Sequence, residues 1–366
     1  MKLFECQACG QPLYFENTGC ESCGRRLGYL ADLADLSALE EAPEGWRALA
    51  APDRRWRFCA NAEHGVCNWL VAADGAEPYC RACRHNRTIP DLAAPQNREL
   101  WRLLESAKHR LIYTVVALGL PLIARSEDPA AGLAFDFLAD PPVPGPPRVM
   151  TGHDNGLITI NLAEADDAER ARARAAMGEP YRTLLGHMRH ETGHYYWDRL
   201  VATDPAALEA FRALFGDERR DYDAALAAHY NQGPPPDWRD RFVSTYASCH
   251  PWEDFAETWA HYLHIVDTLE TARAFGLRVR PRIAAGAELA TRVDFDPHQG
   301  VGVERLVEAW LPLTFAVNSL NRSMGQPDLY PFVLSPTAIA KLGFVDRVVH
   351  GTAGRASAVA AAAPAE

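Results

Sequence analysis

Eight of the nine cysteines in this 366-residue chain lie before residue 84, in two groups of four. The first group consists of Cys6, Cys9, Cys20 and Cys23. Its two CxxC pairs are separated by ten residues, and each pair is followed at once by a glycine. Two CxxC turns each present two sulfurs from one compact loop, and tetrahedral Zn²⁺ accepts four thiolates. The spacing therefore predicts a zinc ribbon over residues 1–35.

The second group is spaced more widely and consists of Cys59, Cys67, Cys80 and Cys83. Four thiolates are the simplest ligand set, with His64 or His85 as the substitute if one cysteine is not a ligand. A unit this small buries too little apolar surface to fold alone, so metal binding is expected to supply the missing free energy. We predict a second zinc module over residues 55–95. Residues 36–54, rich in Ala, Glu and Pro, are expected to form a linker or short helix.

The start of the chain, MKLFECQACG, lacks the apolar core of a secretory signal. Nine cysteines in such a chain indicate metal binding in a reducing compartment rather than a disulfide framework, so we expect a cytoplasmic protein. The longest apolar stretch, residues 111–124, is shorter than the roughly 20 residues that span a bilayer and contains Pro121. We expect a buried helix there and no membrane partner. The net charge of -11 argues against binding nucleic acid over the whole surface.

Residues 190–194, HETGH, match the HExxH motif. On a helix, His190 and His194 project from the same face, and Glu191 lies beside them as a candidate general base. The pattern predicts a buried helix over residues 179–201, opened by Glu179 and Pro180. Before it, the sequence predicts a strand at 131–140, a proline-rich loop, a hairpin that turns at residues 154–156 and a polar helix at 165–177. After it, the pattern is mostly helical.

A hydrolytic zinc site needs three protein ligands and an open position for water. The metzincin extension of the motif is excluded, because Trp197 and Leu200 replace its glycine and histidine. Glu253 and Glu257 lie four residues apart on an amphipathic helical segment, so one can bind metal while the other orients a ligand histidine. Glu253 is our candidate third ligand. Asp254 and Glu257 are the alternatives.

The motif is followed at a distance by Tyr246 and then by the pattern ExFAExW at residues 253–259. This arrangement resembles the gluzincin metallopeptidases, most closely the protease domain of anthrax lethal factor. The whole chain apart from its alanine-rich tail is similar to a bacterial family of zinc-binding metallopeptidases with an N-terminal zinc-ribbon domain. The resemblance implies an α+β, mostly helical gluzincin-like domain over residues 96–351. Residues 352–366 are of low complexity, so we expect a disordered tail there. It assigns zinc ligation to Glu253, a supporting role beside the ligands to Glu257, and an oxyanion hydrogen bond to Tyr246.

We therefore predict a zinc-dependent peptidase with one catalytic and two structural Zn²⁺ ions and a protein or peptide substrate. By analogy with gluzincin-like folds, residues 158–162 are the candidate edge strand that pairs with an extended substrate. For Tyr246 a core tyrosine with a satisfied hydroxyl is the alternative, while His187 is expected to pack or support and Cys249 to be a buried free thiol. The rival function is an inactive adaptor that binds nucleic acid or protein through its zinc modules. Arginines interleaved with aromatic residues at 54–57 and 79–87 support that reading.

Overall fold

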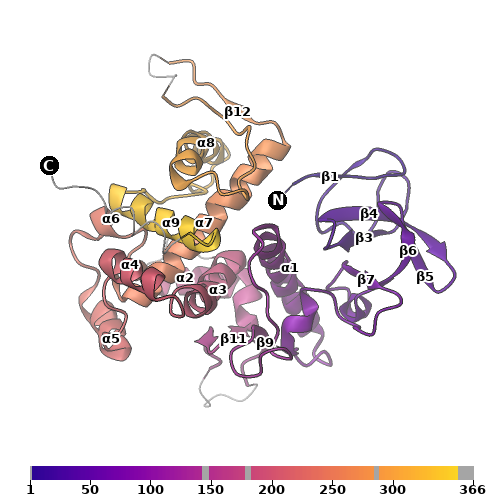
Figure 1. Ribbon diagram of the computed structural model, residues 1–366, viewed down its shortest axis with the longest axis horizontal. Helices are drawn as coiled ribbons and strands as arrows, with labels where there is room; N and C mark the ends of the chain where they lie inside the picture. The colour runs from indigo at the N-terminus through magenta and orange to yellow at the C-terminus, as the bar shows by residue number, and fades with distance from the viewer. Residues whose placement is uncertain (1, 142–147, 178–182, 284–287, 353–366) are drawn as a thin grey trace. The chain divides into compact units, whose positions relative to one another are not determined.

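The computed structural model describes residues 2–141, 148–177, 183–283 and 288–352. The chain divides into two compact units, Met1–Ala173 and Arg174–Glu366 (Figure 1). Helices and several sheets are both present, which confirms the α+β class, but less than half of the described residues are helical, so the expectation of a mostly helical chain is wrong. Within the described ranges, no helix has the length and apolar character needed to cross a membrane. Much of the predicted proline-rich loop and nearly all of the predicted tail lie outside the described residues.

The first unit begins with a two-stranded ribbon and an antiparallel sheet of strand order β3-β4-β5-β6-β7. The ribbon is β1 (Phe4–Glu5) with β2 (Pro12–Leu13), and the sheet strands are β3 (Leu27–Leu30), β4 (Asp35–Ala42), β5 (Gly45–Ala48), β6 (Ala51–Phe58) and β7 (Leu70–Ala72). A β-bridge also joins Tyr29 of β3 to Trp69, the residue directly before β7. Short 3₁₀ turns follow at η1 (Ala60–His64) and η2 (Cys83–His85).

The expectation of a linker or short helix at residues 36–54 is wrong, because this segment forms β4, β5 and the start of β6. Glu44 and Gly45 both have positive φ, and they turn β4 back along β5. Leu39, Ala48 and Trp56 then point into one apolar cluster. The many Ala and Glu residues conceal this alternation, since neither is a strong strand former.

The second part of the first unit is a four-stranded sheet of order β10-β11-β9-β8 beside a long helix. Its elements are β8 (Asn86–Thr88), α1 (Pro95–Ala117), β9 (Ala134–Leu138), β10 (Gly152–Asp154), β11 (Leu157–Asn161), η3 (Leu162–Ala165) and the first part of α2 (Asp167–Met177), which continues into the second unit. The predicted strand, hairpin and polar helix are thus confirmed. α1 ends four residues before Pro121, so only part of the apolar stretch at 111–124 is helical.

The predicted edge strand at residues 158–162 is wrong. β11 pairs with β10 on one side and with β9 on the other, so its backbone groups are used within the sheet. The hairpin places the shorter β10 at the outer edge instead.

The second unit is built around helix α7. Its elements are α3 (Leu184–Leu200), α4 (Pro205–Phe215), α5 (Tyr222–Gln232), α6 (Trp238–Arg241), η4 (Tyr246–Ser248), α7 (Pro251–Ala274), β12 (Arg278–Val279), β13 (Thr291–Arg292), α8 (Val303–Ser323) and α9 (Pro336–Val349). Helices α3, α8 and α9 all pack on α7 (Figure 1). The strands β12 and β13 were not predicted, because two residues each are too few for a pattern.

Two helix starts set the register of the candidate site. Thr183 has extended backbone angles and its side chain accepts a hydrogen bond from the Gly186 backbone N–H, so α3 begins at Leu184 rather than at Glu179. The residues predicted to open the helix lie outside the described part of the chain. His250 caps α7 through the Trp252 backbone N–H, which places Glu253 in the first turn as expected.

Candidate metal centres

The HExxH helix and α7 bring three side chains together. His190 Nε2 lies 2.9 Å from Glu253 Oε2, and His194 Nε2 lies 3.5 Å from Glu253 Oε1. The candidate ligand atoms of these three buried residues are all within 4.8 Å of one another. Two imidazole nitrogens and one carboxylate oxygen are a donor set that zinc accepts at catalytic sites, where a fourth position stays open for water. The residues present therefore fit a zinc ion.

Glu257 lies one helical turn beyond Glu253, on the other side of the His190 ring. Its Oε1 is 2.7 Å from His190 Nδ1, and its Oε2 accepts a hydrogen bond of 2.6 Å from Ser244 Oγ. A carboxylate at Nδ1 keeps the proton on that nitrogen and turns the Nε2 lone pair toward the metal position. Burial alone would raise the pKa of the Glu257 carboxyl, but the contact with His190 lowers it to about 2.

Asp254 points elsewhere. Its Oδ2 is 2.5 Å from Lys341 Nζ, and both side chains are almost fully buried. Burial raises the pKa of the Asp254 carboxyl to about 7, although the Lys341 charge opposes the shift. In the described part of the chain, Glu253 alone of the three candidate carboxylates groups with both motif histidines.

Glu191 contacts His187, one turn earlier on α3. The distance from Glu191 Oε1 to His187 Nε2 is 3.1 Å. Burial would raise the pKa of the Glu191 carboxyl, but the hydrogen bond and charge of His187 hold it below its ordinary value. Glu191 is therefore a carboxylate near neutral pH and can accept a proton.

Two tyrosines lie beside the three candidate ligands. The Tyr246 ring on η4 is 5.8 Å from the His190 ring between centroids. The Tyr222 hydroxyl donates a hydrogen bond of 2.7 Å to Glu253 Oε1. Burial, followed by the charge of Glu253, raises the pKa of both phenols above their ordinary value, so both stay protonated donors.

Sequence reasoning missed Tyr222 and Trp252. The Trp252 ring lies 3.8 Å from the His194 ring between centroids. The position of Trp252 directly before the candidate ligand Glu253 could have marked it as a residue of the site. Tyr222 lies 31 residues before Glu253 at an ordinary helix start, so nothing in the sequence marked it. Cys249 is buried and free, as expected, and burial raises the pKa of its thiol.

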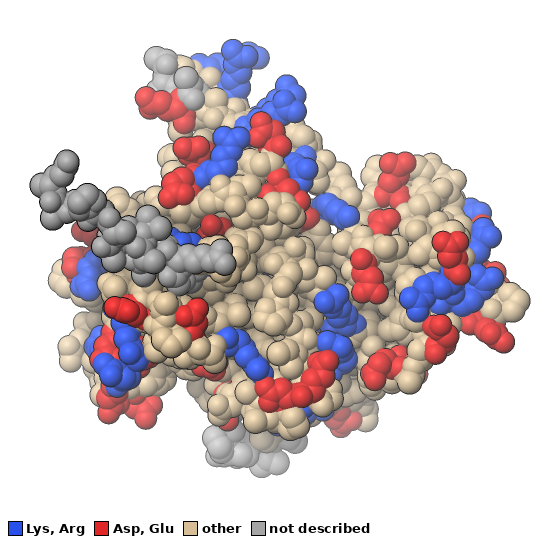
Figure 2. All heavy atoms as spheres, in the orientation of Figure 1, with Lys and Arg blue, Asp and Glu red and all other residues tan. Residues whose placement is uncertain are grey.

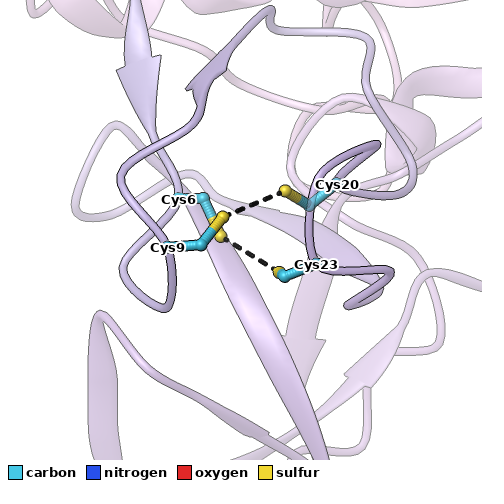
Figure 3. Close-up of side chains that lie close together, drawn as sticks. All are labelled: Cys6, Cys9, Cys20 and Cys23. Atoms are coloured by element: carbon cyan, nitrogen blue, oxygen red, sulfur yellow. Dashed lines mark hydrogen bonds between the residues drawn. The ribbon is translucent and has the colours of Figure 1, made fainter.

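The first cysteine group forms a compact cluster between β1 and β3 (Figure 3). Cys6 Sγ lies 3.7 Å from Cys23 Sγ, and Cys9 Sγ lies 3.6 Å from Cys20 Sγ. A tetrahedral site with Zn–S bonds of about 2.3 Å has sulfur–sulfur edges of about 3.8 Å, so the sulfurs are spaced as zinc requires. Gly10, with φ of 74°, closes the first CxxC turn through a hydrogen bond to the Cys6 carbonyl.

The second cysteine group also converges. Cys67 Sγ lies 3.8 Å from Cys80 Sγ, and all four sulfurs are within 4.8 Å of one another. His64 pairs with Glu63, and His85 Nδ1 faces the Leu133 carbonyl. The histidine that does reach the sulfurs is His109 of α1, which sequence reasoning missed.

Of the aromatic residues considered for nucleic-acid binding, Trp56 and Trp69 are buried, whereas Tyr79 is exposed. Arg54 faces Asp74, and Arg57 donates to the backbone carbonyls of Gly75 and Glu77. On the face shown in Figure 2, basic and acidic side chains of the described residues lie interspersed.

Comparisons with known proteins match two zinc-binding families to the chain. A family model described as "putative zinc-binding metallo-peptidase" matches residues 97–348, and a zinc-ribbon domain model matches residues 3–94, which include both cysteine clusters. Relatives from Mycobacterium tuberculosis and Mycobacterium bovis, each described as an uncharacterized protein, are 42% identical over 353 residues, covering 96% of this chain and 96% of each relative. No solved structure matches the chain.

Proposed function

The chain belongs to the family described as putative zinc-binding metallo-peptidases, as its sequence motifs indicated, and from this premise we propose that it hydrolyses peptide bonds at a zinc ion held by His190, His194 and Glu253. The observation that carries the proposal is the convergence of these three buried donors. The carboxylate of Glu257 behind His190 adds to it, because such partners orient metal ligands. We assign the catalytic part to the gluzincin type on this His-His-Glu set.

The side chains around the site supply the remaining chemistry. Zinc bound there would polarise the scissile carbonyl and lower the pKa of an attacking water. Glu191 would take the proton from that water and pass it to the leaving amine, because His187 keeps it ionised. Tyr222 is engaged with Glu253, so we assign the hydrogen bond to the oxyanion to Tyr246.

We propose that the two cysteine clusters each hold a structural zinc ion, giving three ions per chain. Their sulfur spacing supports this number. Bound zinc would stabilise the zinc-ribbon region, because it would cross-link the two CxxC turns and the second cysteine group. A role in recruiting a protein substrate or partner is favoured over nucleic-acid binding, because two of the three aromatic residues considered for base stacking, Trp56 and Trp69, are buried and only Tyr79 is exposed.

The test compares wild type with Glu191→Gln and with a matched control, Glu209→Gln, at an exposed position on α4. Metal analysis of each protein is followed by proteome-wide cleavage profiling. We expect three zinc ions in all three proteins, and cleavages that are lost only in Glu191→Gln. Cleavages that persist in Glu191→Gln would contradict the assigned base. A zinc-loaded wild type without any cleavage would favour the inactive adaptor.

A further inference from the structure

The C-terminal part of helix α7 brings two carboxylates together with a histidine from another segment. Asp267 and Glu270 are three positions apart on α7, so they lie on one face of the helix. His298 belongs to the segment between β13 and α8. One possible ligand atom from each of these three residues lies within 4.8 Å of those of the other two. None of the three belongs to the metal centres described above.

The histidine of this group has one buried nitrogen that lacks a protein partner. His298 Nδ1 lies 3.3 Å from Asp296 Oδ1, and the His298 side chain is only 6% exposed. A carboxylate beside Nδ1 favours the neutral tautomer with its proton on that nitrogen, which leaves a lone pair on Nε2. Within the described residues, Nε2 is buried and has no hydrogen-bond partner. Because a buried acceptor is costly without a partner, this nitrogen points to a ligand.

Asp267 can bind a cation and keep its contact with α3. It is buried, and its Oδ2 accepts a hydrogen bond from the Arg189 guanidinium. A carboxylate has about four lone-pair sites on its two oxygens, so bonding to an arginine is compatible with a metal bond. Glu270 is half-buried, and its longer side chain can adjust its distance to an ion. Metal bonds of about 2.0–2.2 Å reach ligand atoms up to about 4.4 Å apart, so small rotations suffice.

The donor set selects the class of ion and its strength of binding. Mg²⁺ and Ca²⁺ take oxygen ligands, whereas an imidazole nitrogen suits divalent transition metals. Arg189 shares Asp267, and Arg273 lies 3.7 Å from Asp296, so two positive charges oppose a bound cation. We therefore expect weaker binding than at the cysteine clusters and loss of the ion during purification. The three zinc ions expected above are unaffected.

We propose that Asp267, Glu270 and His298 form an exchangeable binding site for a divalent transition-metal ion. The bound ion ties the segment that leads into α8 to the C-terminal part of α7. It stabilises the folded chain by an amount that grows with the concentration of the free ion. The inference rests neither on the catalytic zinc nor on peptidase activity, so it can fail or hold independently of the proposed function.

The first test titrates the zinc-loaded full chain with Mn²⁺ and measures free Mn²⁺ by electron paramagnetic resonance. Mn²⁺ binds a given site more weakly than Zn²⁺, so it leaves the other centres loaded with zinc. Wild type is compared with His298→Asn, Glu270→Gln and a matched control, Glu308→Gln, at an exposed position on α8. We expect one Mn²⁺ per chain in wild type and control, and affinity about tenfold or more lower in the other two variants. Equal affinity in all four proteins, or no binding to wild type, would overturn the proposal.

The second test uses wild type alone, so it decides even if the variants fail to fold. Crystals of the zinc-loaded full chain are soaked with Mn²⁺, and an anomalous difference map is measured at the manganese absorption edge. We expect a peak between the Asp267, Glu270 and His298 side chains. A map without a peak there, whether or not Mn²⁺ is found elsewhere, would overturn the proposal.

Discussion

Substitution of Gly193 by alanine should destabilise the protein, although glycine within a helix is usually improved by alanine. Gly193 lies where α3 crosses α7, and a Cβ placed there would be 2.8 Å from Ala256 Cα and 3.3 Å from Ala256 Cβ. Carbon atoms in contact are normally about 3.5–4.0 Å apart. Because the obstacle is backbone, the two helices would have to separate by roughly 0.7 Å or more.

The magnitude follows from two opposing contributions. Gly→Ala in a helix interior stabilises by about 0.8–1.0 kcal/mol, whereas overpacking a close contact costs about 1–3 kcal/mol. We expect a net loss of up to about 2 kcal/mol in the free energy of unfolding. The separation also moves Glu253 on α7 away from His190 and His194 on α3. Zinc sites hold ligand distances within about 0.2 Å, so zinc affinity at this site should fall by about tenfold or more.

Urea unfolding followed by circular dichroism gives the stability, and chelator competition gives the zinc affinity. The matched control is Gly343→Ala on α9, where the new Cβ would be 3.0 Å from the Val303 Cγ1 methyl, which can rotate away. The control should keep wild-type zinc affinity and stay within about 1 kcal/mol of wild-type stability. A Gly193→Ala protein at least as stable as wild type, with unchanged zinc affinity, would refute the close crossing as the element that holds the site.

Three further predictions concern the surroundings of the site. Glu257→Gln should lower zinc affinity by about 10–100-fold, since His190 Nδ1 loses its anionic partner; chelator competition at the wild-type value would contradict this role. Tyr246→Phe should lower kcat in steady-state kinetics and leave zinc affinity unchanged, because Tyr246 is assigned to the oxyanion. Tyr222→Phe should lower zinc affinity in metal titrations, because its hydroxyl holds Glu253. The opposite pattern would assign the oxyanion to Tyr222 and the support of Glu253 to Tyr246. Burial lowers the pKa of His261 from 6.5 to about 4 in the folded state. Between these two pH values the unfolded state binds a proton at this histidine and the folded state does not, so the free energy of unfolding falls as the pH is lowered from 6.5 toward 4. Over that range the unfolding free energy of wild type should therefore fall more steeply than that of His261→Asn, and parallel curves from urea titrations would show that this histidine does not contribute.

Much of the candidate site could be predicted because its signals are local. The HExxH spacing and the two cysteine groups each place their side chains through one helix turn or one tight loop. Only the structure could decide between Glu253 and Asp254 as the candidate ligand, because it shows that Asp254 forms an ion pair with Lys341 of α9. That pairing joins residues 87 positions apart and leaves no mark in the sequence.

The misses share a physical cause. β4 and β5 are strands because they pair with neighbours and bury Leu39 and Ala48, not because their residues favour extended structure. His109 and Tyr222 are ordinary helix residues until tertiary packing brings them to a cluster formed elsewhere in the chain. The substrate-strand prediction failed for a similar reason, since strand order in a sheet depends on which neighbours pair.

The most direct test of the account is an anomalous difference map at the zinc absorption edge from crystals of the full chain. We expect one peak at each cysteine cluster and a third within about 2.0–2.2 Å of the Nε2 atoms of His190 and His194 and of a Glu253 carboxylate oxygen. Peaks at the cysteine clusters without a peak at these three side chains would contradict the proposed catalytic centre.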